Sequence, residues 1–214
     1  MKKDNRYDVS GLSEAQFEPG SNEQVLRNRS GIKSPKDMDD TEARALERAM
    51  VEVVGKYDER HCFTAADICE IHKRWLGEIY PWAGEYRQVN VSKGEFPFAA
   101  AARVPELMME FETKVLARCT PCNFRDRAAV VRALAETHVE LVLIHPFREG
   151  NGRAARILSI LMALQAGLPP LNFSSIAEEK KREYFSAVQA GLDKNYAPME
   201  RLFAEIIERS LASS

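Results

Sequence analysis

The sequence predicts a mainly α-helical domain with one small β-hairpin. Apolar side chains recur at helical spacing through most of residues 41–211, which indicates a set of packed helices. The shorter period of a strand is found over residues 86–91. There is no internal repeat and no low-complexity linker in the 214 residues. We therefore expect one helical domain over residues 41–214, preceded by an arm over residues 1–40.

The arm is polar and is interrupted by glycine and proline, so we expect it to be irregular. The apolar residues by which it would pack on the domain are Tyr7, Leu12, Phe17, Val25 and Leu26.

Two helices are expected to follow the arm. Asp39, Asp40 and Thr41 provide a cap and acids for a first turn, and Gly55 would end that helix after about Val54. Its inward face would be Leu46, Met50, Val53 and Val54. A second helix would begin at Thr64, with apolar residues continuing to Ile79. His72 lies on its inner face, where we expect a packed, hydrogen-bonded core residue and not a ligand.

Residues 86–91 alternate polar and apolar side chains, which is typical of a strand. Ser92, Lys93 and Gly94 would form the turn, and residues 95–98 the return strand. Because an isolated hairpin is marginal in water, it should lie on the helical body or offer an edge to another chain.

Further helices are expected over about 104–116, 125–144, 152–166, 177–191 and 198–211. The two that flank residues 145–151, 125–144 and 152–166, are strongly apolar and should form the centre of the core.

Composition excludes several functional classes. The net charge is −2, which disfavours a nucleic-acid-binding protein. No apolar run is long enough for a membrane span, and residues 1–6 do not begin a secretory signal. We expect a cytoplasmic protein with unpaired thiols at Cys62, Cys69, Cys119 and Cys122. The single CxxC pair within them is a weak indication of zinc.

The stretch from Ile144 to Arg156 concentrates polar chemistry at one turn. Pro146 ends the preceding helix, and Gly150 and Gly152 allow a tight turn and a close approach of a ligand. His145 is a candidate base and Glu149 a carboxylate. A helix N-terminus and two arginines three residues apart follow, a combination that suits phosphate oxygens.

His145 to Arg156 resembles the motif HPFx(D/E)GNGRxxR of Fic-domain proteins at every specified position. Similarity to the family extends through Ile71–His72, Trp82–Arg87, the hairpin segment Val91–Phe96 and the helix before the motif, and covers about residues 40–210. Val25–Ile32 is similar to a lead-in found in many bacterial members. The resemblance implies a Fic-type helical bundle with a hairpin flap.

The resemblance also implies transfer of AMP from ATP to a Tyr, Thr or Ser hydroxyl of a target protein. In that reaction His145 would be the general base and Glu149 would hold Mg²⁺. Phosphate oxygens would be bound by main-chain and side-chain donors of the turn and by the two arginines. The nucleotide-binding residues are then Gly150, Asn151, Gly152, Arg153 and Arg156, with Tyr184 near the base.

The residues between and around these positions have secondary roles. Phe147 would be a buried anchor for the turn, and Arg148 a solvated charge. The flap would hold the target peptide by strand addition. Its target-binding residues would be Lys93, Gly94, Glu95 and Phe96. Gly152 argues against the kinase branch of the family, which has a lysine there.

Many members of the family are inhibited by a glutamate in the pattern (S/T)xxxE(G/N). Three serines have a glutamate four residues later, but Ala15, Glu179 and Lys180 follow Glu14, Glu178 and Glu179. None completes the pattern. We therefore expect a separate small antitoxin that supplies the glutamate, with this chain as the toxin. The alternatives are a non-catalytic Fic module, one that uses another nucleotide, or an effector fragment delivered to a host cell.

Overall fold

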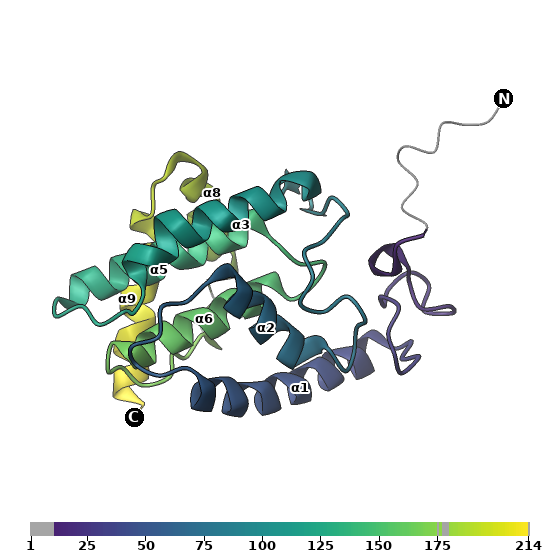
Figure 1. The fold of residues 1–214 in the computed structure, drawn as a ribbon, viewed down its shortest axis with the longest axis horizontal. Helices are drawn as coiled ribbons and strands as arrows, with labels where there is room; N and C mark the ends of the chain where they lie inside the picture. Colours follow the sequence, from purple (N-terminus) through teal and green to yellow (C-terminus); the bar gives the residue numbers. More distant parts are fainter. Residues whose placement is uncertain (1–10, 175, 177–179, 214) are drawn as a thin grey trace.

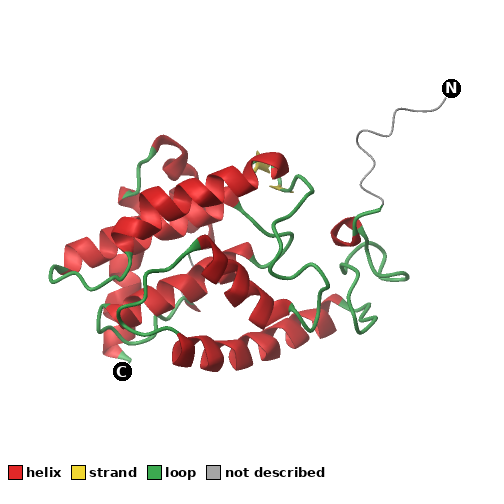
Figure 2. Ribbon diagram, in the orientation of Figure 1, coloured by secondary structure: helices red, strands yellow, loops and turns green. Residues whose placement is uncertain are grey.

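The computed structural model describes residues 11–174, 176 and 180–213. In this part of the chain helices dominate, and the strands are limited to one short hairpin (Figures 1 and 2). This confirms the predicted mainly α fold. The longer helices are α1 (Pro35–Lys56), α2 (Ala65–Leu76), α3 (Val104–Phe111), α5 (Arg127–Ile144), α6 (Asn151–Gln165), α8 (Lys181–Ala190) and α9 (Ala197–Ala212).

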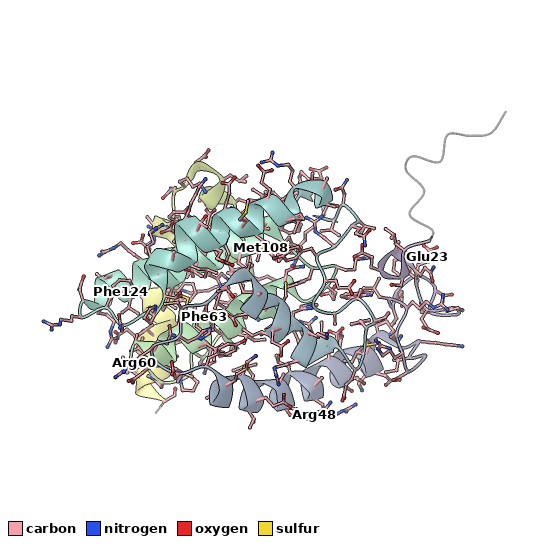
Figure 3. All side chains as sticks on the ribbon, in the orientation of Figure 1. Glu23, Arg48, Arg60, Phe63, Met108 and Phe124 are labelled. Carbon is pink, nitrogen blue, oxygen red and sulfur yellow. The ribbon has the colours of Figure 1, made fainter. Side chains whose placement is uncertain are left out.

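The core is built around α5, which packs against α6, α9, α3 and α8. Helix α2 joins α6 to α1, and α1 forms one long side of the molecule (Figure 1). Leu134 and Leu158, from α5 and α6, are almost fully buried. Met108 and Phe63 lie in the interior, whereas Arg48 and Arg60 lie on the outside (Figure 3). The prediction that the two helices flanking the turn form the centre of the core is confirmed.

Helix α1 begins earlier than predicted. Ser34 is its N-cap, with a side chain that accepts a hydrogen bond from the N–H of Asp37, and Pro35 is the first helical residue. Asp39 and Asp40 are therefore exposed positions inside the helix. The predicted inward position of Val54 is also wrong, because its side chain is exposed; the small Ala45 and Ala49 are buried instead.

The predicted strand over residues 86–91 is wrong. The strands are β1 (Ser92–Lys93) and β2 (Phe96–Pro97), so Gly94 and Glu95 form the turn. Gly94 has a φ of +59°, which suits glycine in that turn. The carbonyl of Val91 still accepts from the N–H of Phe98, but further upstream the main chain bonds elsewhere: the N–H of Arg87 donates to the carbonyl of Pro146 and that of Gln88 to the Glu14 carboxylate. The apolar side chains of the predicted alternation, Tyr86, Val89 and Val91, are only partly buried, and the buried side chain of the segment is that of Arg87.

The other predicted elements hold with small changes. Thr64 caps α2 and Asp126 caps α5. The helix that begins at Val104 continues from α3 through a π-helical segment, η3 (Glu112–Leu116), into α4 (Ala117–Cys119). Short 3-10 turns are η1 (Ser13–Ala15), η2 (Ala101–Arg103) and η4 (Gly191–Asp193). The predicted start of a helix at 177 lies outside the described residues.

Val25 and Leu26 are buried and belong to the hydrophobic core. Phe17 pairs with Leu26 in a β-bridge but its ring stays 39% exposed, and Tyr7 lies outside the described residues. The four cysteines form no disulfide. No group of three or more potential metal-binding side chains occurs in the described residues, and no helix there could span a membrane.

Candidate active site

The motif turn connects the two central helices, α5 and α6. His145 caps the end of α5 in the left-handed region, with a φ of +54°, and Gly150 precedes α6 with a φ of +82°. A Cβ on Gly150 would lie 2.8 Å from Cζ3 of Trp75, so the position requires glycine for both its backbone and its space. An atom added to Gly152 would meet nothing within 4 Å, so the first turn of α6 is open.

The turn is held by buried contacts. Phe147 is completely buried and stacks on His72, with 3.8 Å between ring centroids. This confirms both the anchor role of Phe147 and the core role of His72. His72 Nδ1 accepts a hydrogen bond from the N–H of Gly84, so its Nε2 donates to the carbonyl of Glu149, at 3.0 Å. Burial lowers the pKa of His72 to about 4, which keeps this bridge neutral.

Asn151 also holds the turn. Its Oδ1 accepts from the N–H of Phe147 and its Nδ2 donates to the carbonyl of Phe147, both at 2.8 Å. The side chain is buried, so its main contribution is to the shape of the loop. Only its second N–H remains for the predicted contact to a nucleotide. The first hydrogen bond inside α6 runs from the N–H of Ala154 to Gly150, so the main-chain N–H groups of Asn151, Gly152 and Arg153 have no acceptor within the helix and can bind an anion.

His145 is oriented as a base. Its Nδ1 lies 3.0 Å from the carbonyl of Val142, an acceptor only, so Nδ1 carries the proton and Nε2 has the free lone pair. The ring of Phe98 stacks on the imidazole, with 3.5 Å between centroids. Burial is the main cause that lowers the pKa of His145 to about 4, and the nearby Arg87 adds to it. The imidazole is thus neutral at physiological pH.

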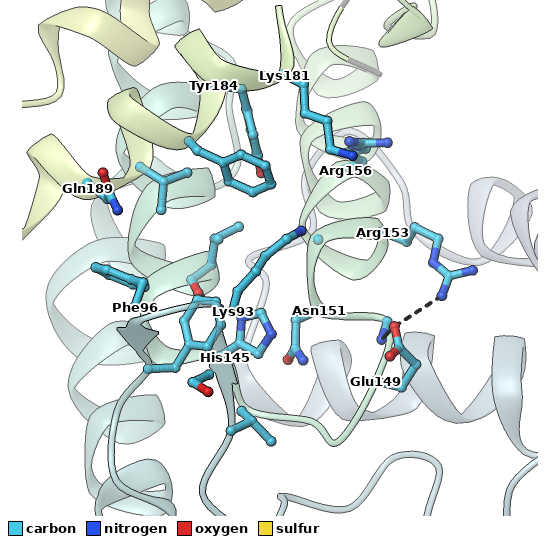
Figure 4. A pocket seen from close by; sticks show the side chains of 18 of the residues that line it. Lys93, Phe96, His145, Glu149, Asn151, Arg153, Arg156, Lys181, Tyr184 and Gln189 are labelled. Carbon is cyan, nitrogen blue, oxygen red and sulfur yellow. Dashed lines mark hydrogen bonds and ion pairs between the residues drawn. The ribbon is translucent and has the colours of Figure 1, made fainter. Parts of the chain in front are cut away.

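His145 lies in a pocket of about 750 Å³ between the motif, the hairpin and α8 (Figure 4). Glu149, Arg153 and Arg156 line one side, and Lys93 and Phe96 of the hairpin line another. The structure thus brings together the candidate base, the turn and two of the four predicted flap residues, Lys93 and Phe96.

The hairpin presents its cation to the pocket. Lys93 Nζ lies 4.2 Å from the centroid of the Phe185 ring. Burial first, and then the charge of Lys181, lower the pKa of Lys93. Gly94 and Glu95, at the tip of the hairpin, are exposed and do not line the pocket.

The two arginines of the motif have different surroundings. Arg153 Nη1 lies 2.6 Å from the buried carboxylate of Glu42, and Nη2 lies 3.3 Å from Glu149. Arg156 has no carboxylate partner among the described residues, and its Nε is buried without a hydrogen bond. Its guanidinium carbon lies 5.8 Å from the centroid of Phe173. Arg156 is therefore a fixed cation suited to an anionic ligand.

Glu149 is the one acidic side chain among the residues that line the pocket in the described part of the chain. Oε1 accepts from the N–H of Gly150 and contacts Arg153, whereas Oε2 has no hydrogen bond or ion pair with a described residue. One hard carboxylate oxygen beside an anion site fits Mg²⁺, which typically takes one or two carboxylates and completes its shell with phosphate oxygens and water.

The hydroxyl of Tyr184 is less available to a nucleotide than predicted. Its hydroxyl donates to Nε2 of the buried His138, at 2.8 Å, and His138 Nδ1 in turn donates to Ser159. Burial lowers the pKa of His138 to about 3 and raises that of Tyr184 to about 12. Tyr184 lines the pocket but can offer a ligand its ring and not its hydroxyl.

Arg148 is not the solvated charge that was expected. Its Nε donates to the carbonyl of Glu14, at 2.9 Å, and so ties the motif to the arm. The Glu14 carboxylate accepts from the N–H of Gln88, so its partner is not Arg156. Glu178 and Glu179, the other glutamates tested against the inhibitory pattern, lie outside the described residues.

Sequence reasoning missed two side chains that organise the site. Arg87 is 2% exposed, and its guanidinium donates to the carbonyls of His145, Ile144, Val89 and Ala99. It thereby satisfies the carbonyls at the end of α5. Glu42 is far from the motif in the sequence, and no local pattern pointed to its contact with Arg153.

Comparisons with known proteins identify related sequences. Residues 62–163 match the model of the Fic/DOC family. The chain is 29% identical over 189 residues to "Protein adenylyltransferase Fic" of Aedes aegypti, an alignment that covers 87% of the chain. The chain spans about a third of the length of that relative (36%).

Two solved structures with bound nucleotides share the fold. The BepC effector of Bartonella tribocorum with AMPPNP has a TM-score of 0.72 at 22% identity, covering 92% of this chain and 97% of that one. The N-terminal Fic domain of a Bartonella quintana effector with ADP has a TM-score of 0.71 at 24% identity, covering 91% and 95%.

Proposed function

Because the chain belongs to the Fic/DOC family, we propose that it is a protein adenylyltransferase, which moves AMP from ATP to a Tyr, Thr or Ser hydroxyl of a target protein. The observation that carries the proposal is the geometry of His145. Its unprotonated Nε2 is set by the bond from Nδ1 to Val142, at the edge of a pocket with an anion site. The name of the Aedes aegypti relative and the nucleotides bound to the Bartonella proteins support it.

In the proposed reaction His145 Nε2 takes the proton of the target hydroxyl. The hydroxyl oxygen forms a bond to the α-phosphorus of ATP, the bond from that phosphorus to the bridging oxygen breaks, and pyrophosphate leaves. The free N–H groups at the start of α6 and the Arg156 guanidinium hold phosphate oxygens. Glu149 would hold Mg²⁺, which neutralises charge on the leaving group.

The hairpin is the proposed site of the target peptide. A two-stranded sheet leaves main-chain donors and acceptors unpaired on its outer edges, so an extended peptide can add as a third strand. Lys93 and Phe96 line the pocket beside His145, which would direct a hydroxyl of that peptide toward Nε2. Gly94 and Glu95 would contact the target peptide at the tip of the hairpin.

The direct test is incubation with Mg²⁺, candidate targets and ATP labelled either at the α- or at the γ-phosphate. We expect label from the α-phosphate on protein, and a loss of at least about 100-fold in rate for His145→Ala. His61→Ala is a matched control, since His61 contacts Asp67 away from the pocket. Label from the γ-phosphate would instead establish kinase chemistry. Labelling by another nucleotide, or by none, would favour the alternative Fic modules.

The proposal extends to a toxin inhibited in trans by a small antitoxin. Support comes from Arg156, which no carboxylate of the described residues neutralises. Growth arrest on expression, relieved by a co-purifying small protein that contributes a glutamate to Arg156, is the expected result. The Bartonella relatives are translocated effectors by name, so an effector role is the competing candidate. Modification of host but not bacterial proteins would favour it.

A further inference from the structure

Glu42 is a buried carboxylate that the proposed reaction does not use. It lies in α1, outside the motif, and its side chain is 4% exposed. Oε2 lies 2.6 Å from Arg153 Nη1, and Oε1 accepts a hydrogen bond from the hydroxyl of Tyr80 at 2.7 Å. Its main-chain carbonyl accepts from the indole N–H of Trp75. A buried carboxylate with both oxygens bound is fixed in position and charge.

Arg153 contacts two carboxylates, and its contact with Glu42 is stronger than its contact with Glu149. Nη1 makes the short contact to Glu42, whereas Nη2 is 3.3 Å from Glu149 Oε1, the interaction marked in Figure 4. The guanidinium also lies over the ring of Trp75, at 4.6 Å. The Glu149 side chain is 46% exposed, so water weakens the second contact. The buried partner therefore determines where Arg153 lies.

We infer that Glu42 is a positioning residue for Glu149: by holding and neutralising Arg153, it keeps the Glu149 carboxylate available to a divalent cation. Without the Glu42 charge, Arg153 would pair fully with Glu149, and its positive charge would oppose a cation at the same carboxylate. This inference rests on the proposed function, in which Mg²⁺ reaches Glu149 with the nucleotide. In this chain Arg153 is then held mainly by Glu42, and Arg156 is the main cation for phosphate.

The test is Glu42→Gln, which keeps the side-chain shape and an acceptor for Tyr80. Calorimetry would measure binding of α,β-methylene-ATP, which cannot be cleaved at the bond in question, over a Mg²⁺ series and in EDTA. We expect the Mg²⁺ concentration for half-maximal enhancement of binding to rise about tenfold, with affinity in EDTA changed by less than about twofold. Glu52→Gln is the matched control, because Glu52 lies in the same helix and pairs with Arg74 at the surface.

A second variant separates positioning from folding. In Glu42→Gln/Arg153→Gln both charges are removed together, so neither is left buried and unpaired. We expect its Mg²⁺ midpoint to return to within about threefold of that of the unsubstituted chain, because the competing cation is gone.

Two results would overturn the inference: an unchanged midpoint in a folded Glu42→Gln protein, or a tenfold higher midpoint in the double variant. If Glu42→Gln does not fold, the double variant decides. Failure of the proposed function appears differently, as no binding of the analogue by the unsubstituted chain.

Discussion

Acid should weaken this fold through three buried histidines before its carboxylates titrate. The folded-state pKa is lowered, mainly by burial, to about 4 for His72 and His145 and to about 3 for His138. An unfolded chain protonates histidine near pH 6.5. Between pH 6.5 and about 4 the unfolded state therefore binds up to three more protons than the folded state, so stability falls as the pH falls.

The magnitude follows from linkage. At 1.36 kcal/mol for each pKa unit, each of the three histidines reduces the free energy of unfolding by about 1.6 kcal/mol between pH 6.5 and 5.0. The sum, on the order of 5 kcal/mol, is comparable with the whole stability of many domains. Asp67, whose pKa is lowered by hydrogen bonds from His61 and Thr64 against the raising effect of burial, loses its contribution only below this window.

Urea unfolding followed by circular dichroism at pH 7.0, 6.5, 5.5 and 5.0 measures this dependence. His138→Gln should remove about a third of the slope with pH, whatever it does to stability at pH 7. The slope is the informative quantity because a loss of packing lowers the free energy of unfolding by the same amount at every pH. A free energy of unfolding that stays constant from pH 7 to 5 would refute the assignment of these histidines as buried and neutral.

Three further substitutions test the site. Gly150→Ala should lower stability by about 2 kcal/mol or more, since strain at positive φ adds to a steric clash; thermal unfolding would measure it, and an unchanged midpoint would contradict the packing described. Asn151→Ala leaves the buried main chain of Phe147 unpaired and should cost about 2–3 kcal/mol in urea unfolding, whereas a neutral result would assign Asn151 to the ligand alone. Phe98→Ala admits water to His145, so the pKa of its imidazole measured by NMR should rise from about 4 toward 6.5, and no rise would show that the stacked ring does not cause the shift.

The sequence predicted the helices more accurately than it predicted the contacts between them. Thr64, the predicted start of α2, caps that helix, and Asp126 caps α5 next to the predicted start at 125, because capping is a local interaction. The same reasoning misplaced α1, since Asp39 and Asp40 imitate the first turn that Ser34 and Pro35 in fact begin.

The motif turn was foreseeable because its glycines, proline and polar side chains are consecutive. What could not be foreseen depends on tertiary contacts. Glu42 reaches Arg153 only because α1 packs against α2 beside the motif. Arg148 was predicted to be solvated because the sequence does not show that the carbonyl of Glu14, in the arm, lies beside it. The hairpin register was missed since the main chain of Arg87 pairs with Pro146 and not with a strand.

Arg87 has a consequence for how targets could change while the chemistry stays the same. Its one guanidinium binds the carbonyl of His145 and, beyond the hairpin, that of Ala99. Both ends of the intervening segment, Arg87 and Ala99, are thereby linked through the Arg87 guanidinium to the main chain of His145. Gly94 and Glu95, exposed at the tip of the hairpin, can be exchanged without changing the contacts that Arg87 and Phe98 make with His145. If the hairpin binds the target as proposed, substitutions at its tip would change the choice of target while His145 keeps its position.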